Sequence, residues 1–243
     1  MMLLAIDVGN TRIKWGLHDS VAWRAQGQVA HAEITSLCAA LVDLPKPTRI
    51  VVSHVAAVPL YGVLAQALAQ FNLPLQRVYA CARQCGVENG YADPAQLGAD
   101  RWAALIAAQH LAGGTQLVVN AGTALTADAL HAGRFLGGLI VPGYRLLGDA
   151  LQHATALPNT AAGQFSGWPD NTRDALETGR LRALAGAVAA QYQQLAQHAG
   201  AQPGLVLSGG DAATLAPYLP QPVRQIDNLA LEGLRLIALD MTP

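Results

Sequence analysis

The amino-acid sequence predicts an α/β protein made of two similar halves, each with a mixed sheet flanked by helices. Two observations lead to this prediction. Short apolar runs with strand composition alternate with longer segments whose apolar residues recur at helical spacing. The order of these segments, three strands, a helix, a strand and a helix, then occurs a second time. Such a duplication predicts two similar lobes, and clefts between lobes are favoured ligand sites.

The first half begins with an expected antiparallel meander, because short turns join its three strands. Helical spacing of the apolar residues, with proline or glycine stops, defines the helices that follow. The expected strands are residues 2–8, 12–17, 21–25, 50–53 and 76–80, and the expected helices are residues 31–44, 59–71 and 97–111.

The second half repeats this pattern after a pair of glycines, Gly113 and Gly114. The boundary is therefore expected there, which divides the chain into residues 1–114 and residues 115–243. The expected strands are residues 116–120, 124–130, 135–141 and 205–208, and the expected helices are residues 144–155, 173–198 and 228–239.

Composition and charge exclude several classes of protein. Hydrophobic residues make up 52% of the chain and charged residues 13%, which argues against disorder. The longest apolar runs are shorter than the roughly 18 residues of a membrane-spanning helix, and the apolar start lacks the basic lead of a signal peptide. A net charge of −1 without a basic stripe argues against nucleic-acid binding. We therefore expect neither a membrane nor a nucleic acid as partner.

The three cysteines, Cys38, Cys81 and Cys85, are an odd number without a secretory signal, which favours a reducing, cytoplasmic location. Cys81 and Cys85 lie close in sequence, but no second Cys/His pair completes a tetrahedral metal site.

The first turn whose residues suit ligand binding is formed by residues 7–11, with the sequence Asp-Val-Gly-Asn-Thr. Gly9 lets the backbone approach an anion closely, and successive N–H groups can bind it. Asp7 ends the strand and can hold hydrated Mg²⁺ beside phosphates, while Lys14 can neutralise phosphate charge. A plain β-turn is the alternative, since these are common turn residues. The paired turn at Gly122 and Thr123 favours the phosphate reading.

The chain contains neither a P-loop motif nor a Rossmann glycine motif. Any nucleotide is therefore expected to be held by hairpin turns, the first in the N-terminal half and the second in the C-terminal half.

The second motif, residues 91–101, combines a helix start with an Asp-Arg pair. Asp93 is expected to cap a helix that opens with a proline. Gly98 is unfavourable inside a helix, so either the helix begins there or something packs closely. Asp100 can accept the proton of a substrate hydroxyl, and Arg101 can bind a carboxylate. The alternative is a dipole-stabilising Asp beside an ordinary surface Arg.

Two further turns are weaker candidates. Thr172 precedes a helix and is first of all expected to be its N-cap. Residues 208–211, Ser-Gly-Gly-Asp, follow a strand and can admit an adenine or ribose, or can simply be a tight turn.

Four segments, residues 7–11, 98–101, 122–126 and 137–143, resemble the motifs of type III pantothenate kinases in this order and spacing. The resemblance extends from about residue 2 to about residue 237. It implies the actin-like ATPase superfold of acetate and sugar kinases, with two ribonuclease H-like lobes. It also implies ATP-dependent phosphorylation of pantothenate, the first step of coenzyme A biosynthesis, by a homodimer whose second lobe carries the dimer helix.

The resemblance also implies roles for single residues. Asp100 would be the catalytic base. Those that would bind ATP are Asp7, Val8, Gly9, Asn10, Thr11, Arg12, Ile13, Lys14 and Thr123. Those that would bind pantothenate are Tyr91, Gly98, Ala99, Asp100, Arg101 and Thr172.

Asn120 is a departure from the family pattern, in which many members have an aspartate that helps to hold K⁺ or NH₄⁺. An amide oxygen can ligate K⁺ but lacks the charge, so the site is weakened, abolished or compensated elsewhere. Mg²⁺ is expected with ATP.

Two alternatives to a pantothenate kinase stay open. One is a kinase for another small hydroxy acid or sugar, because superfolds host many functions. The other is a catalytically weak member that acts as an accessory or regulatory protein.

Overall fold

The computed structural model describes residues 1–56, 58–154 and 163–241. The chain forms two compact units, and each is described here by itself. Unit 1 comprises Met1–Leu111 and a C-terminal segment that begins at Asn228, whereas unit 2 comprises Ala112–Asp227. The segment from Asn228 was expected in the second half, residues 115–243, but it belongs to unit 1.

The sheet of unit 1 has five strands in the order β3-β2-β1-β4-β5. Strand β1 lies at its centre, antiparallel to β2 and parallel to β4, so the sheet is mixed as predicted. The strands are β1 (Leu3–Val8), β2 (Arg12–His18), β3 (Trp23–Ala30), β4 (Arg49–His54) and β5 (Leu75–Arg77).

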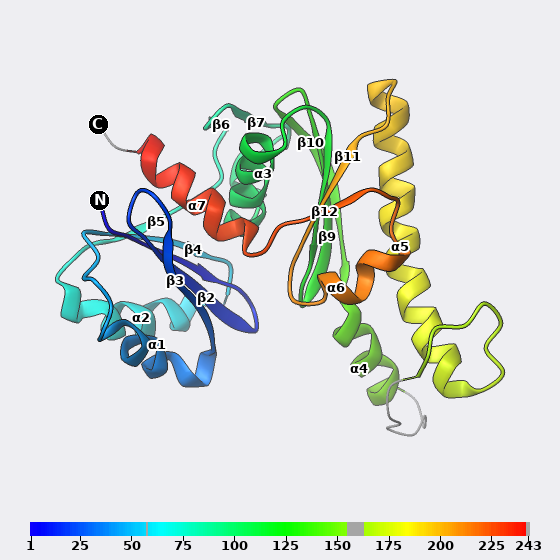
Figure 1. The fold of residues 1–243 in the computed structure, drawn as a ribbon, viewed down its shortest axis with the longest axis horizontal. Coiled ribbons are helices and arrows are strands. Elements are labelled where there is room, and N and C mark those ends of the chain that lie inside the picture. The colour runs from blue at the N-terminus through cyan, green and yellow to red at the C-terminus, as the bar shows by residue number, and fades with distance from the viewer. Residues whose placement is uncertain (57, 155–162, 242–243) are drawn as a thin grey trace. The chain divides into compact units, whose positions relative to one another are not determined.

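Helices cover both faces of this sheet (Figure 1). Leu4, Ile6 and Val8 alternate along β1 and point to the face that α1 and α2 cover, where they form a buried core. The intervening residues, Asp7 among them, point to the face of α3 and α7. The helices are α1 (Ile34–Leu41), α2 (Val58–Leu68), α3 (Ala99–Leu111) and α7 (Leu229–Asp240), with 3₁₀ turns at His31–Glu33, Ala69–Phe71 and Pro94–Gln96 and a hairpin of β6 (Arg83–Gln84) and β7 (Val87–Asn89).

The strands of unit 2 repeat the order found in unit 1, with β8 in the place of β1. They run β10-β9-β8-β11-β12, and β8 is again antiparallel to the strand that follows it and parallel to the strand beyond. The predicted duplication is therefore confirmed at the level of topology. The strands are β8 (Gln116–Ala121), β9 (Ala124–His131), β10 (Arg134–Pro142), β11 (Gly204–Ser208) and β12 (Val223–Gln225).

The helices of unit 2 pack on one face of its sheet through a single hydrophobic cluster. Helix α5 (Thr172–Ala199) contributes Leu181, Leu184 and Val188, the apolar stripe that the sequence predicted. The other helices are α4 (Tyr144–Ala154), α6 (Ala212–Leu215) and a 3₁₀ turn at Ala216–Tyr218.

Several boundaries differ from the expected ones. Strand β3 runs five residues beyond residue 25, because its alternation of half-buried and exposed positions lets it pair along the whole of β2. Helix α1 ends at Leu41, before the prolines, and β5 ends at Arg77. The hairpin β6–β7, α6 and β12 were not expected, since segments of two to four residues carry no periodicity. Residue 155, the expected end of the fourth helix, lies outside the described residues.

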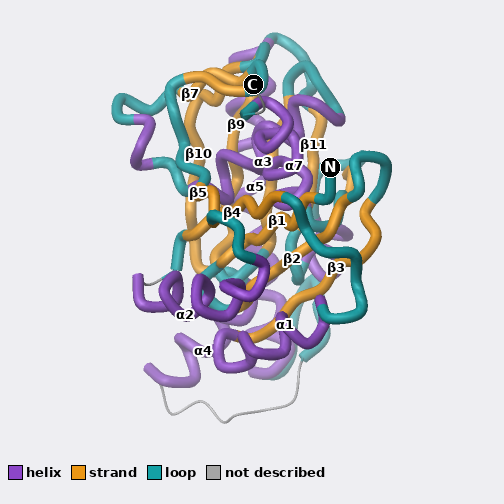
Figure 2. Tube along the Cα trace, turned by 90° about the vertical axis from the view of Figure 1, so that its left-hand side faces the viewer, coloured by secondary structure: helices purple, strands orange, loops and turns teal. Residues whose placement is uncertain are grey.

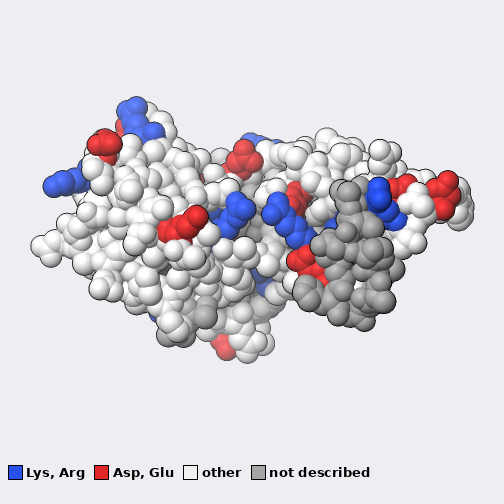
Figure 3. Space-filling view, turned by 90° about the horizontal axis from the view of Figure 1, so that it is seen from below, with Lys and Arg blue, Asp and Glu red and all other residues white. Residues whose placement is uncertain are grey.

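The part of the chain that the structure describes contains no helix long and apolar enough to cross a membrane. On the face drawn in Figure 3, the described surface is largely uncharged, and the Lys and Arg side chains stand in small groups near Asp and Glu.

Helices α3 and α7 of unit 1 cross at very short range, and they lie side by side in both Figure 1 and Figure 2. The crossing depends on Gly233 of α7. A Cβ atom at this position would lie 1.8 Å from the carbonyl oxygen of Ala103 in α3, which no side-chain rotation relieves.

Replacing Gly233 by Ala is therefore expected to lower the free energy of unfolding by about 2–3 kcal/mol, the usual cost of overpacking against a rigid neighbour. Gly186→Ala in α5 is the matched control, since a Cβ there meets nothing within 4 Å. It is expected to raise stability by about 0.5–1 kcal/mol through helix propensity. Urea denaturation measures both, and equal effects would contradict the close crossing.

Candidate functional site

Three polar side chains, those of Lys14, Asp7 and Ser53, form a row across neighbouring strands of unit 1. Lys14 on β2 and Ser53 on β4 are the register partners of Asp7 on β1, so all three lie on the face of α3 and α7. The Ser53 hydroxyl donates a hydrogen bond of 2.5 Å to Oδ1 of Asp7. Asp7 and Lys14 were expected at the site, whereas Ser53 was missed, although a polar residue at the end of the apolar strand 50–53 was a usable signal.

The environment of Asp7 raises the pKa of its carboxyl group to about 6. Burial is the largest cause, and the charge of Asp100 acts in the same direction. The Ser53 hydrogen bond and the charge of Lys14 lower the pKa but do not compensate. Asp7 and Asp100 therefore lie within electrostatic range of each other inside unit 1.

The turn after β1 closes with a hydrogen bond of 3.1 Å from the Gly9 amide to the Arg12 carbonyl. Its tip, Asn10 and Thr11, is exposed, and the His31 Nε2–H donates to the Gly9 carbonyl at 2.9 Å. Gly9 does not adopt a positive φ, and a Cβ there would meet only the Arg12 carbonyl at 3.4 Å. Neither the backbone conformation nor the packing of the described chain requires a glycine at position 9. A ligand that approaches the backbone closely would explain why this position is a glycine.

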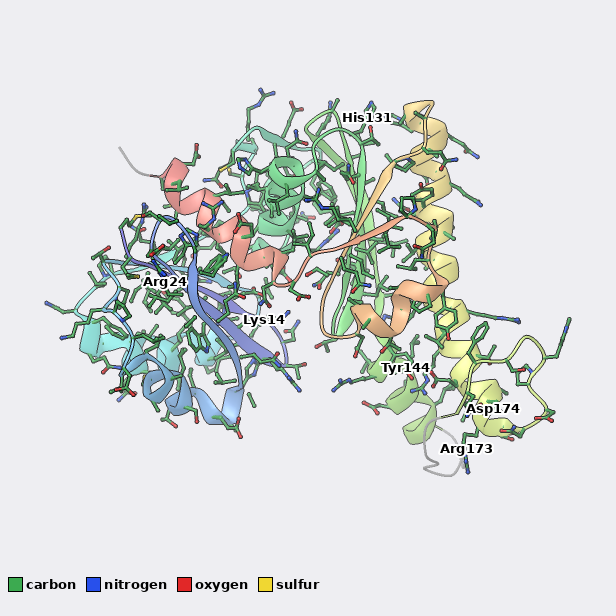
Figure 4. The ribbon with its side chains drawn as sticks, in the orientation of Figure 1. Lys14, Arg24, His131, Tyr144, Arg173 and Asp174 are labelled. Carbon is green, nitrogen blue, oxygen red and sulfur yellow. The ribbon has the colours of Figure 1, made fainter. Side chains whose placement is uncertain are left out.

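The residues on either side of this turn differ in the groups that they can present to a ligand. Val8 and Ile13 are fully buried in the hydrophobic core, so only their backbone can face a ligand. Arg12 is exposed and Lys14 is half-buried, and both can present a cation. Figure 4 shows Lys14 on β2.

The segment before α3 is organised by two side chains. Asp93 accepts a hydrogen bond from the Ala95 amide at 3.0 Å and caps the short 3₁₀ turn that opens with Pro94, as predicted. Asn89, which was not predicted, is buried, accepts from the Tyr91 amide at 3.1 Å and donates to the Pro94 carbonyl at 3.2 Å. These bonds fix the backbone that carries Tyr91.

Helix α3 begins directly after Gly98, whose carbonyl accepts from the Trp102 amide at 2.9 Å. Asp100 lies in the first turn and folds back over Gly98, because a Cβ on residue 98 would lie 2.6 Å from Oδ1 of Asp100. Both readings of the unusual glycine are therefore confirmed: the helix starts there, and a carboxylate packs closely on it.

The carboxyl group of Asp100 has a raised pKa, chiefly because it is buried. Hydrogen bonds from the amides of Arg101 and of Asp100 itself, and the charge of Arg101, act against the rise. Such an environment makes the carboxylate a stronger base than an exposed aspartate.

Arg101 is only 7% exposed, so it is not the surface residue of the alternative reading. Its Nη1 donates to the Tyr91 hydroxyl at 3.4 Å, and its guanidinium carbon lies 6.0 Å from the centre of the Tyr91 ring. Ala99 is buried beside it. Its planar guanidinium group can pair with a carboxylate through two parallel hydrogen bonds.

Unit 2 carries the second turn. Gly122 and Thr123 follow β8, Thr123 is exposed, and its carbonyl accepts from the Gly143 amide at 2.9 Å. A Cβ on Gly122 would make only ordinary contacts, at 3.5 Å and beyond, so this glycine too is not required by the described chain.

A row of polar residues also crosses the strands of unit 2. Asn120 on β8 is the register partner of Thr126 on β9 and of Ser208 on β11. The row occupies the same topological place as Lys14, Asp7 and Ser53 in unit 1, but its residues are uncharged. Next to it, Gly209 has a φ of +107° and packs on the backbone of Ala121, so the turn at residues 208–211 is tightly built.

Thr172 is not the N-cap of α5, which corrects the sequence prediction. The cap is Asn171, whose side chain accepts from the Asp174 amide at 3.0 Å, and Thr172 is the first helical residue. Asp174 in turn accepts from the Gln164 amide at 2.7 Å. Thr172 is exposed, and Figure 4 labels Arg173 and Asp174 in the helix turn that it opens.

The sequence comparisons decide the family. The model of the type III pantothenate kinase family matches residues 3–194. The chain belongs to this family. The type III pantothenate kinase of Nitrosospira multiformis is 46% identical over 98% of this chain and 91% of its own length, and that of Aromatoleum aromaticum is 44% identical over 98% of each.

Similar solved structures show the same fold. A conserved putative Baf family transcriptional activator from Campylobacter jejuni superposes with a TM-score of 0.60 at 23% identity, over 97% of both chains. A putative 2-dehydro-3-deoxygalactonokinase from Sinorhizobium meliloti has a TM-score of 0.59 at 17% identity, over 99% of both chains. This chain thus has the two-unit α/β fold that sugar kinases share, as its fold class predicted.

The residues of unit 1 fit the Mg²⁺ that accompanies ATP in kinases. Mg²⁺ keeps several waters and needs only one or two protein carboxylates besides the phosphates. Asp7 would supply such a carboxylate, and its pKa is raised chiefly because the group is buried. No group of three or more His, Cys, Asp or Glu able to hold a metal occurs within the described ranges.

The raised pKa of Asp7 predicts a pH dependence of nucleotide use. As the pH falls through about 6, Asp7 takes up a proton and loses the charge that would attract hydrated Mg²⁺ if it holds the metal. The kcat/KM for MgATP is therefore expected to fall about tenfold per pH unit below this value and to be level above it. A pH–rate profile measures this. Asp7→Asn should be weakly active without this inflection, and an unchanged inflection in that variant would contradict the assignment.

Proposed function

We propose that the protein transfers the γ-phosphoryl group of ATP to the primary hydroxyl of pantothenate, giving 4′-phosphopantothenate, the first step of coenzyme A biosynthesis. Membership of the type III pantothenate kinase family supports this reaction. The observation that carries it is the pair Asp7 and Asp100, two partly buried carboxyl groups that interact within unit 1.

Asp100 is proposed as the catalytic base. The hydroxyl oxygen of pantothenate forms a bond to the γ-phosphorus while the bond from that phosphorus to the β,γ-bridging oxygen breaks and ADP leaves. The hydroxyl proton passes to Asp100, late in the transfer. The raised pKa of the Asp100 carboxyl group favours this proton transfer, and the tight packing against Gly98 fixes its direction.

Arg101 and Tyr91 are proposed to bind the pantothenate carboxylate. The Arg101 charge is buried and oriented by the Tyr91 hydroxyl. A substrate carboxylate would face the guanidinium in a bidentate pair and would offset the cost of burying it. Gly98, Ala99 and Thr172 complete the proposed substrate set by family resemblance.

Asp7, Lys14 and the backbone of the first turn are proposed to bind the ATP phosphates. Asn10 and Thr11 are exposed and offer an amide and a hydroxyl side chain, whereas the Gly9 amide closes the turn on the Arg12 carbonyl. The absence of a side chain on Gly9 leaves room for a phosphate oxygen. Mg²⁺ bound with ATP would neutralise charge on the phosphates, with Asp7 holding its water shell. Thr123, beside the permissive Gly122, is proposed to contact ATP from unit 2.

A monovalent cation is proposed as a weaker requirement. Asn120, Thr126 and Ser208 present only neutral oxygen atoms in one row, so a K⁺ or NH₄⁺ ion there would lack a carboxylate ligand. We further propose a homodimer and a cytoplasmic location, in keeping with the family resemblance and the cysteine content.

The reaction is tested by incubating the purified protein with pantothenate, ATP and Mg²⁺, with and without about 0.15 M K⁺, a physiological ionic strength. Phosphopantothenate is expected in both conditions, with a smaller response to K⁺ than in a variant with Asn120→Asp. Absence of product with folded protein would favour the accessory-protein alternative, and turnover of another hydroxy acid or a sugar would favour a different kinase.

Asp100→Asn is expected to lower kcat by about 10²–10⁴, the usual contribution of a general base, because the amide cannot accept the hydroxyl proton. Calorimetric titration with MgATP should give a dissociation constant within about threefold of the wild type, since the change lies outside the phosphate turn. Near-normal turnover would refute the assignment of the base.

A further inference from the structure

We infer that Ser53 is a positioning residue of the kinase site, which holds Asp7 in the orientation that binds the Mg²⁺ of MgATP. The inference rests on the proposed function, and it adds a residue that no motif of the family resemblance includes.

The contact between Ser53 and Asp7 is fixed by the register of two parallel strands. Ser53 on β4 is the direct partner of Asp7 on β1, and both side chains leave the sheet on the same face. The Ser53 side chain is fully buried, so water cannot take the place of Asp7 as the acceptor for its hydroxyl. Its hydroxyl donates to Oδ1 of Asp7 at 2.5 Å, and a hydrogen bond to an ionised carboxylate is stronger than one between neutral groups.

This hydrogen bond decides which oxygen of Asp7 is available. With Oδ1 engaged inside the sheet, Oδ2 is the oxygen left to accept from a water of the metal shell. Without the bond, Asp7 can rotate toward the Lys14 ammonium group on the other neighbouring strand, with which it interacts electrostatically. Ser53 therefore keeps the carboxylate from pairing with the lysine.

Unit 2 provides an internal comparison. The duplicated topology places Ser208 beside Asn120 as it places Ser53 beside Asp7, with Thr126 in the place of Lys14. The serine recurs at the end of the parallel neighbour, where its register partner is the amide Asn120 in unit 2 and the carboxylate Asp7 in unit 1. The charged version of the row is thus confined to the unit that carries Asp100.

The test compares binding of MgATP and of metal-free ATP (in EDTA) by calorimetry. Ser53→Ala is expected to weaken MgATP binding about tenfold, the effect of one hydrogen bond to a charged group. Metal-free ATP should bind within twofold of the wild type, because the contact acts through the metal shell. Ser53→Cys keeps the volume with a much weaker donor and should follow Ser53→Ala.

Val51→Ala is the matched control. Val51 lies on the same strand and face, is equally buried and has no polar atom in its side chain. The Val51→Ala variant therefore loses stability but keeps the hydrogen bond between Ser53 and Asp7. It should bind MgATP as the wild type does. Wild-type affinity in either Ser53 variant, or an equal loss in Val51→Ala, would overturn the inference. Failure of the wild type itself to bind MgATP would instead refute the proposed function.

Discussion

The repulsion between two carboxyl groups, those of Asp7 and Asp100, is the constraint on which the site of unit 1 depends. The burial of Asp7, and in second place the charge on Asp100, raise the pKa of Asp7 to about 6. The sheet register, the Ser53 hydroxyl and the close packing of Asp100 on Gly98 hold both groups in place nonetheless. Such an arrangement costs stability in the free protein and suits a cation bound with the substrate.

The duplicated fold explains how one topology serves two tasks. Each unit places a central strand between an antiparallel neighbour and a parallel neighbour, and ends the central strand at a turn with a glycine that the described chain does not need. In unit 1 the polar row is charged and is joined by α3, whereas in unit 2 it is neutral. This division is the structural basis for the proposal that both turns bind phosphate and that the acid–base residue lies in unit 1.

Much of the fold was predictable because periodicity and turn residues are local signals. The order of strands, the stripe of α5 and the cap at Asp93 could all be read from the sequence. Short elements could not be predicted, since β6, β7 and β12 are formed by pairing with other strands and their few residues show no periodicity. Ser53 was missed for a similar reason: its role depends on the register of two strands 46 residues apart in sequence. The cap of α5 was misplaced by one residue, because Asn171 and Thr172 are both good caps and only the backbone decides.

The central claim, that Asp7 and Asp100 are electrostatically coupled, is tested most directly by a carboxyl ¹³C NMR titration of the aspartates. The account predicts one resonance that titrates near pH 6, is absent in Asp7→Asn and moves to lower pH in Asp100→Asn. Titration of every aspartate below about pH 5, close to the ordinary range of the residue, or an Asp7 resonance whose midpoint does not move in Asp100→Asn, would contradict it.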